Sequence, residues 1–287
     1  MHFAEAKGIL LSQNFMNIYR GCTHGCIYCD VRSECYQFKH NFDDVEVKSN
    51  APILLEQALR KKRKKGIIKT GYMSDSYMPY EKELCLTRQC LEMIYKYDFS
   101  VTIQTKSNLV LRDLDLLEAI NNKNKSIVQM TATTYDEELC KYVEPNVCST
   151  KERFEALKVL QSKGIPTVVW ITPILPFIND TESNIMGLLK YCLDTGVKGI
   201  ICGIGVTLRN GNREYFYKKL NEHFPGLQKK YEQKYGFTYD CKSDQEHALM
   251  QMVRNFCDDN KILLNDAAAQ YMFAHEQKEE IEQLTLF

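Results

Sequence analysis

Short apolar, β-branched runs alternate with amphipathic segments along most of this chain. The apolar runs predict strands, and the segments with apolar residues three or four positions apart predict helices. The predicted strands cover Asn17–Arg20, Gly66–Tyr72, Phe99–Thr105, Ile127–Ala132, Thr167–Ile171 and Val197–Ile204. The predicted helices cover Pro52–Lys64, Leu86–Tyr97, Leu114–Asn121, Thr150–Lys163 and Thr181–Thr195.

The alternation of strands and helices predicts an α/β fold with a parallel sheet covered by helices. Six such units are too few to close the eight-stranded TIM barrel, so we expect a partial (β/α)6 TIM-type barrel over residues 1–208. With 287 residues, 44% of them hydrophobic, the chain is large enough for a substantial core. Residues 209–277 are expected to form a C-terminal helical extension over the open side of the barrel, and residues 278–287 an exposed tail.

Three cysteines follow the first predicted strand at the spacing Cys-x3-Cys-x2-Cys: Cys22, Cys26 and Cys29. Three thiolates suffice to bind three irons of a [4Fe–4S] cluster, whose usual complement is four, and the fourth iron is then open to another ligand. Cys35 keeps a four-cysteine zinc knuckle open as a competing interpretation. A third interpretation is that these thiols bind no metal.

The other eight of the twelve cysteines are scattered along the chain. Free cysteines of this kind usually pack as small buried hydrophobes. A disulfide framework is not expected, because the chain is too long and its cysteines too sparse for a stapled mini-domain. With no apolar run long enough to span a membrane, these observations predict a protein of the reducing cytoplasm.

The cysteine motif, with Tyr28 in its aromatic position, resembles the signature Cys-x3-Cys-x-aromatic-Cys of the radical S-adenosylmethionine (SAM) superfamily. The opening segment Asn17–Cys26 and the segments after the later strands resemble its spore photoproduct lyase-like branch, over roughly residues 14 to 205. Within that branch the chain is similar to the radical SAM mobile pair protein B group. This resemblance implies a [4Fe–4S] cluster whose open iron is chelated by SAM. Electron transfer then cleaves SAM to a 5′-deoxyadenosyl radical, which takes hydrogen from a substrate.

The resemblance also assigns residues and partners. Cys22, Cys26 and Cys29 would ligate the cluster, and the SAM-binding residues would be Tyr28, Ser74, Asp75, Lys106, Thr133 and Arg153. Ordinary packing remains an alternative role for Tyr28, and a solvated guanidinium on an amphipathic helix remains one for Arg153. The implied partners are a reductant such as flavodoxin or ferredoxin and a paired radical SAM protein.

One position departs from the photoproduct lyases. Those enzymes carry a cysteine just upstream of the Ser-Asp pair, which returns a hydrogen atom to the product radical, whereas this chain has Tyr72 and Met73 there. Reversal of thymine dimers by the lyase mechanism is therefore not expected. Tyr72, or Cys202 at the end of the sixth strand, is hypothesised to act as the catalytic hydrogen donor.

Charge and the C-terminus bear on partners. Lys and Arg number 37, and so do Asp and Glu, so the whole-protein field is not that of a bulk nucleic-acid binder. The basic run Arg60–Lys65 is either a solvated helix end or a local phosphate-binding patch. The last residues, Gln283–Phe287, resemble the motif by which bacterial DNA-processing proteins bind the sliding clamp; a tail folded back on the core is the alternative.

Three classes of function follow. The first is a radical SAM enzyme acting on nucleic acid, such as a base that is repaired or modified. The second is a radical SAM enzyme acting on a small molecule, a peptide or a partner protein. The third is a non-catalytic iron–sulfur or zinc protein.

Overall fold

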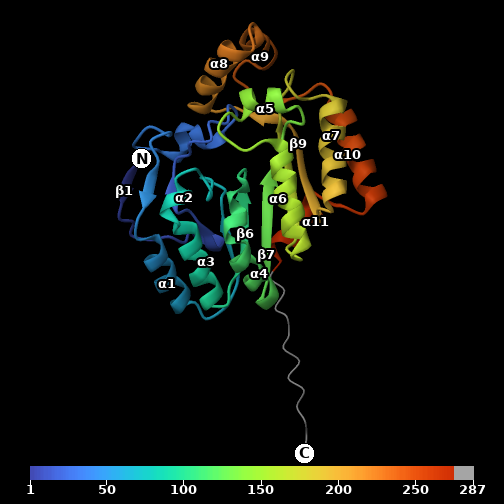
Figure 1. Ribbon diagram of the computed structural model, residues 1–287. Helices are drawn as coiled ribbons and strands as arrows, with labels where there is room; N and C mark the ends of the chain where they lie inside the picture. The colour runs from blue at the N-terminus through green and yellow to red at the C-terminus, as the bar shows by residue number, and fades with distance from the viewer. Residues whose placement is uncertain (275–287) are drawn as a thin grey trace, which may run out of the picture.

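A parallel sheet forms the centre of the molecule in the computed structural model, which describes residues 1–274 (Figure 1). The predicted clamp-binding motif Gln283–Phe287 and the whole predicted tail 278–287 lie outside the described residues. The sheet has eight strands; seven follow the order β10-β9-β8-β7-β6-β5-β2, and β11 pairs with β9. The strands are β2 (Phe15–Met16), β5 (Ile67–Thr70), β6 (Ser100–Thr105), β7 (Ser126–Thr131), β8 (Thr167–Ile174), β9 (Gly199–Thr207), β10 (Asp240–Lys242) and β11 (Leu263–Leu264).

The predicted partial barrel is confirmed. Strands β2, β5, β6, β7, β8 and β9 are paired in parallel, and the antiparallel β10 ends the sheet, so the described strands do not close a barrel. Helices cover the outer face of the sheet (Figure 1). They are α1 (Ala51–Lys61), α3 (Leu86–Lys96), α4 (Leu114–Lys123), α6 (Thr150–Ser162) and α7 (Glu182–Thr195). The short helices α2 (Glu81–Leu84) and α5 (Glu137–Val143) lie in the segments that follow β5 and β7.

The helix boundaries follow from local chemistry. Helix α6 begins with a capping box, in which Ser149 Oγ accepts from the N–H of Glu152 and the Glu152 carboxylate accepts from the N–H of Ser149. Helix α7 ends at Gly196, whose φ of 74° suits glycine and stops the helix. Because parallel strands point the same way, the loops that follow them meet at one end of the sheet, where the cysteine loop also lies.

The first predicted strand needs a correction. The first barrel strand is β2, Phe15–Met16, while Tyr19–Arg20 forms β3 in a second sheet of order β1-β4-β3, with β1 (His2–Ala4) and β4 (Glu46–Lys48). The physical reason is that Tyr19 pairs antiparallel with Val47, which turns the chain away from the barrel before the cysteines. The small sheet therefore supports the cysteine loop from the side.

The C-terminal region is also less purely helical than expected. Helices α8 (Asn212–His223), α9 (Leu227–Tyr235), α10 (Glu246–Asn260) and α11 (Asp266–Phe273) are present, but β10 and β11 both pair with β9. Residues beyond 208 thus extend the main sheet. Helices α8 and α9 stand above its carboxyl end in Figure 1. Within residues 1–274, every helix is too short or too polar to cross a membrane.

Candidate functional site

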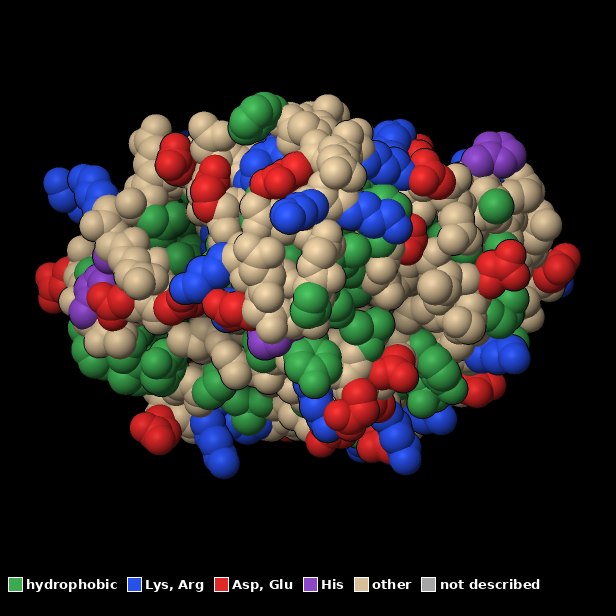
Figure 2. All heavy atoms as spheres, turned by 90° about the horizontal axis from the view of Figure 1, so that it is seen from above, with side chains coloured by type: hydrophobic (Ala, Val, Ile, Leu, Met, Phe, Trp, Pro, Cys, Tyr) green, Lys and Arg blue, Asp and Glu red, His purple; other side chains and the backbone are tan. Residues whose placement is uncertain are grey.

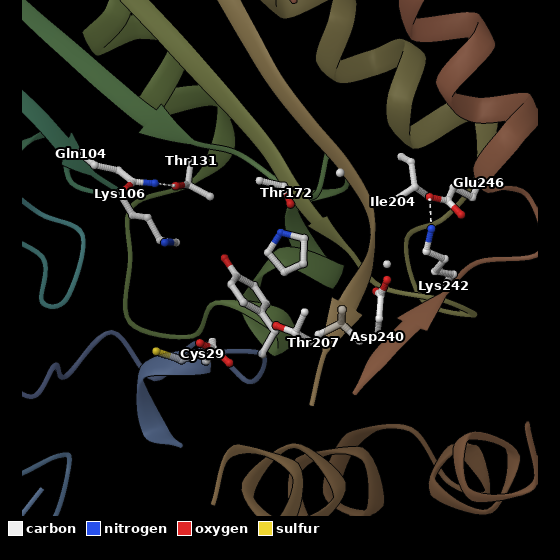
Figure 3. A pocket seen from close by; sticks show the side chains of 16 residues that line it. Cys29, Gln104, Lys106, Thr131, Thr172, Ile204, Thr207, Asp240, Lys242 and Glu246 are labelled. Carbon is white, nitrogen blue, oxygen red and sulfur yellow. Dashed lines mark hydrogen bonds and ion pairs between the residues drawn. The ribbon is translucent and has the colours of Figure 1, made fainter. Parts of the chain in front are cut away.

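A cavity of about 460 Å³ opens at the carboxyl end of the sheet. Cys29 and Lys106 lie on one side of it, and Asp240, Lys242 and Glu246 lie on the opposite side (Figure 3). A second cavity of about 100 Å³ shares Tyr28, Cys29, Gln104 and Lys106 with the first, so the two are neighbours. The second cavity is lined further by Cys22, His24, Cys26, Val31, Gly71, Tyr72, Met73, Ser74, Asp75 and Thr105.

The backbone holds the three cysteines of the motif around the smaller cavity. The N–H of Cys22 donates to the carbonyl of Phe42 at 3.2 Å, and the N–H of Ile27 donates to that of Val143 at 3.0 Å. A Cβ at Gly21, where φ is 97°, would lie 2.4 Å from the Phe42 oxygen, so only glycine fits there. The loop is thereby clamped between two distant segments, with its free thiols facing one space.

The spacing of these thiols suits a cluster better than a single zinc ion. Within residues 1–274, the one set of three His, Cys, Asp or Glu ligand atoms within 4.8 Å of one another is found elsewhere in the molecule. Ligands of a cluster bind separate irons and stand further apart than ligands of a single ion. Cys35 does not line either cavity, and its sulfur accepts from Arg209 Nη1 at 3.2 Å. The structure therefore does not assemble a four-cysteine zinc knuckle.

The neighbouring residues Ser74 and Asp75 have different roles in the site. Ser74 Oγ is buried without a hydrogen-bond partner among the described residues, as expected of a group that awaits a ligand. Both carboxylate oxygens of Asp75 are engaged: Oδ1 accepts from Thr105 Oγ1 at 2.7 Å, and Oδ2 accepts from the N–H of Lys106 at 2.8 Å. Asp75 thus fixes the end of β6 beside Ser74, a positioning role.

Lys106 supplies positive charge to both cavities. Burial by itself lowers the pKa of this ammonium, but the neighbouring acidic groups Cys26, Glu144 and Asp75 raise it above its ordinary value. The group therefore stays cationic. Its Nζ lies 5.9 Å from the centre of the Tyr28 ring. A cation and a ring held together in this way suit a ligand that combines a carboxylate with a planar base.

A buried network that the sequence does not reveal fixes Tyr28. The Tyr28 hydroxyl donates to Glu144, and Arg153 Nη1 donates to the other Glu144 oxygen at 2.5 Å. The Glu144 and Arg153 side chains are both 0% exposed, so the solvated guanidinium is wrong for Arg153. Its Nη1 also donates to the carbonyl of Thr131 at 2.9 Å, and Arg153 lines neither cavity. Arg153 therefore orients Tyr28 through Glu144.

The remaining predicted site residues are placed differently from one another. Tyr72 lines the smaller cavity; its hydroxyl accepts from Gln129 Nε2 at 2.6 Å, and burial raises its pKa to about 12. Thr133 is buried beside Thr134 and lines neither cavity. Cys202 is buried in the core close to Cys257 of α10, so the structure does not bring it to either cavity.

The comparisons with known proteins agree with this site. Residues 16–189 match the Radical SAM superfamily. Because this match covers more than half of the chain, the protein belongs to the radical SAM superfamily. The uncharacterized protein MJ0683 of Methanocaldococcus jannaschii is 37% identical over 169 residues, which are 58% of this chain and 62% of that protein. The uncharacterized protein Rv2578c of Mycobacterium tuberculosis is 26% identical over 226 residues, 77% of this chain and 66% of that protein.

A viral relative and two solved structures add to this. The uncharacterized protein ORF301 of Acidianus two-tailed virus is 30% identical over 220 residues, 72% of this chain and 71% of that protein. Spore photoproduct lyase complexed with dinucleoside spore photoproduct has a TM-score of 0.63 at 14% identity, covering 86% of this chain and 74% of that chain. SuiB of Streptococcus suis, bound to precursor peptide SuiA, has a TM-score of 0.53 at 13% identity, covering 88% of this chain and 47% of that chain. The fold is thus shared with the lyase, in agreement with the lyase-like branch.

Radical SAM proteins use a [4Fe–4S] cluster and SAM, and a structure of the lyase holds bound AdoMet, which is SAM. The site fits both groups: the thiols face one space, Ser74 Oγ has no partner, and Lys106 is cationic. The chain matches less than two thirds of the length of MJ0683 and of Rv2578c. The activity of the whole protein is therefore a matter for proposal.

Replacing Ser74 with alanine is expected to weaken SAM binding about 2- to 10-fold, because one neutral hydrogen bond contributes about 0.5–1.5 kcal/mol. Stability should not fall, since Ser74 Oγ has no partner among the described residues. Equilibrium binding of SAM to the cluster-loaded protein measures the effect. Ser183→Ala, at an exposed position on α7, is the matched control, and equal affinities for the two variants would contradict the assignment.

Proposed function

We propose that this protein is a radical SAM enzyme that takes hydrogen from a nucleobase presented on single-stranded or flipped-out nucleic acid. The observation that carries the proposal is the set of residues that line the larger cavity. The cavity runs from Cys29 and Lys106 to Asp240, Lys242 and Glu246 and so leaves room beyond the residues assigned to SAM (Figure 3). When bound, the cluster and SAM supply reductive cleavage of SAM and a carbon radical that removes a hydrogen atom.

The chain's own residues hold and orient these groups. Cys22, Cys26 and Cys29 hold the cluster, while Ser74 Oγ and the Lys106 ammonium bind the polar end of SAM. Tyr28, whose hydroxyl donates to Glu144, would lie beside the adenine. Cys26 and Ser74 are buried, which limits the access of water to them.

The far side of the cavity suits a planar base. Gly203 and Gly205 line it without side chains, next to the ring of Pro173. A Cβ at Gly203 would lie 2.8 Å from Thr172 Oγ1, so a larger residue here would displace the Thr172 side chain, which also lines the cavity. The carboxylates of Asp240 and Glu246 lie at the rim and are acceptors for exocyclic amino groups, which flipped bases present on their pairing edge.

The exact reaction, lyase-like or base-modifying, includes a hydrogen donor, and Tyr72 is our proposal for it. Its O–H bond would break and a new bond to hydrogen would form on the substrate radical. The external reductant would then restore the tyrosine by supplying an electron, with a proton from solvent. In Tyr72→Phe we expect product formation to fall at least tenfold with SAM binding unchanged, because only the hydroxyl is removed. An unaltered rate of product formation would eliminate Tyr72 as the donor.

A specific observation favours a second candidate, an enzyme acting on a peptide or a partner protein. Asp30, Asp240 and Glu246 surround the cavity, and Lys242, the lysine at the same end, is 3.2 Å from Glu246. Figure 2 shows acidic and basic side chains interspersed on this face of the molecule. Such a surface lacks the strong attraction for phosphates that nucleic-acid binders usually have. A small-molecule substrate belongs to the same class.

Formation of 5′-deoxyadenosine by reduced, cluster-loaded protein separates the candidates. Single-stranded oligonucleotides are expected to raise the rate at least tenfold over SAM alone, whereas unrelated peptides are not. Glu246→Gln should reduce this stimulation without changing SAM affinity. Stimulation by peptides alone would favour the second candidate, and no cleavage of SAM under any condition would leave the non-catalytic iron–sulfur protein.

Recruitment to DNA through Gln283–Phe287 and a paired radical SAM protein as partner also remain proposals. Deletion of residues Leu284–Phe287 is expected to abolish binding to a bacterial sliding clamp, because two leucines and a phenylalanine are lost. The full-length chain is the control. Clamp binding that survives the deletion would refute this partner.

A further inference from the structure

Two histidines and an aspartate from separate segments meet at the small sheet, away from the cavities. His2 belongs to β1, and His40 and Asp44 belong to the loop before β4. A ring nitrogen of each histidine and a carboxylate oxygen of Asp44 all lie within 4.8 Å of one another. The two imidazole rings are 5.0 Å apart, edge to face, and His2 Nδ1 is 3.0 Å from Asp44 Oδ2.

The hydrogen bonds of His40 leave one ring nitrogen available as a ligand. Its Nδ1 lies 2.9 Å from the carbonyl of Asn41, which only accepts, so Nδ1 carries the hydrogen. In the neutral ring, Nε2 then has a free lone pair. This nitrogen is buried and has no hydrogen-bond partner among residues 1–274. In metal-binding histidines, a backbone carbonyl often accepts from the ring nitrogen that does not bind the metal and fixes the tautomer in this way.

Asp44 is anchored without losing its ligand capacity. Its Oδ1 accepts from the amino group of Met1 at 3.1 Å, and Oδ2 faces His2. Ligand atoms about 2.1 Å from one zinc ion stand about 3.4 Å apart in a tetrahedral site. Side-chain rotations that move the ligand atoms by about 1 Å would therefore bring the three groups to bonding distance, and water would complete the coordination.

From these contacts we infer that His2, His40 and Asp44 form a second metal site, for a divalent transition-metal ion such as Zn²⁺. Two imidazoles and a carboxylate are a donor set that Zn²⁺ accepts readily. The site is independent of the radical chemistry proposed above.

The site also has a consequence for the cysteine loop. Phe42 lies between His40 and Asp44 in the sequence, and its carbonyl accepts from the N–H of Cys22 at 3.2 Å. An ion that ties this segment to β1 would hold the acceptor of that hydrogen bond in place. Zinc should therefore raise the temperature at which the protein unfolds and slow the loss of the cluster.

Zinc binding to the full-length, cluster-loaded protein tests the inference, because the cluster occupies the three motif cysteines. We expect calorimetric titration to find one Zn²⁺ per chain. His40→Ala and Asp44→Asn should each weaken its affinity at least tenfold. His247→Ala, at an exposed position on α10, and Cys35→Ala are matched controls that should retain wild-type affinity.

Two outcomes would overturn the site. One is absence of zinc binding to the wild type at about 100 μM, a concentration that would detect even a weak site. The other is undiminished binding in both His40→Ala and Asp44→Asn. Circular dichroism and cluster content, measured before zinc is added, establish that each variant is folded. A zinc-dependent rise in unfolding temperature in the wild type, absent from Asp44→Asn, is the second readout that supports the site.

Discussion

Replacing Cys26 with alanine is expected to abolish the iron–sulfur cluster and, with it, all cleavage of SAM. Cys22, Cys26 and Cys29 line the same cavity, and no other cysteine of residues 1–274 lines it. Burial raises the pKa of the Cys22 thiol to about 12 and also raises those of Cys26 and Cys29. The thiolates therefore form only when iron replaces their protons. The measurement is iron and sulfide content after anaerobic reconstitution.

The matched control for this experiment is Cys35→Ala. Cys35 is exposed, outside both cavities, and its sulfur contacts Arg209. We expect this variant to keep its full cluster content and its rate of SAM cleavage. If Cys35→Ala lost the cluster while Cys26→Ala kept it, the ligand assignment would be refuted.

Glu144→Gln is expected to destabilise the protein by about 3–5 kcal/mol, because it leaves the buried Arg153 guanidinium without its counter-charge. Both side chains are 0% exposed, so water cannot replace the lost partner. The Tyr28 hydroxyl also loses its carboxylate acceptor, so SAM affinity should fall as well. Denaturant unfolding of the cluster-free protein gives the change in free energy, compared at equal pH and salt.

The double variant Glu144→Gln, Arg153→Met is the control for this pair. Removing both charges removes the unpaired ion, so the double variant should be more stable than Glu144→Gln alone. If the losses of stability caused by Glu144→Gln and by Arg153→Met were additive in the double variant, the ion pair would not be the cause.

Lowering the pH should reduce the difference in the free energy of unfolding between the wild type and Glu144→Gln. Burial by itself raises the pKa of Glu144, but Arg153 and Lys106 hold it below the ordinary value. A carboxyl group whose pKa is lower in the folded state stabilises the protein fully above its unfolded pKa, about 4.3. That contribution is lost as the pH falls through the folded pKa. Stability curves of the two proteins should therefore diverge near neutral pH and converge in acid.

The repeating pattern of apolar runs predicts five of the six parallel strands and the five helices that cover them, because each run is buried by its neighbours in the sheet. It misplaces the first strand, since the buried pair Ile18 and Tyr19 looks like part of an apolar barrel strand. Only its pairing with β4, which is a long-range contact, assigns it to the small sheet. For the same reason the short strands β10 and β11 are not evident locally; they depend on the exposed edge of β9.

Among the site residues, the cysteine spacing and the Ser-Asp pair are recognisable in the sequence itself. The structure brings Ser74, Asp75 and Lys106 around the cysteines. Glu144 has no such signal, because its role depends on meeting Tyr28 and Arg153 in space. Arg153 looks solvated in the helical pattern for the same reason. The position of Cys202 depends on which face of β9 each residue occupies, and it lies near Cys192 and Cys257, on the side of the helices.

The most direct test of the central claim is transfer of deuterium from substrate to cofactor. Cluster-loaded protein would be reduced in the presence of SAM and a single-stranded oligonucleotide with deuterated bases, and the 5′-deoxyadenosine analysed by mass spectrometry. If the far side of the cavity holds a nucleobase, the product carries deuterium, and Glu246→Gln lowers the amount. Formation of 5′-deoxyadenosine without deuterium from any oligonucleotide would contradict the account.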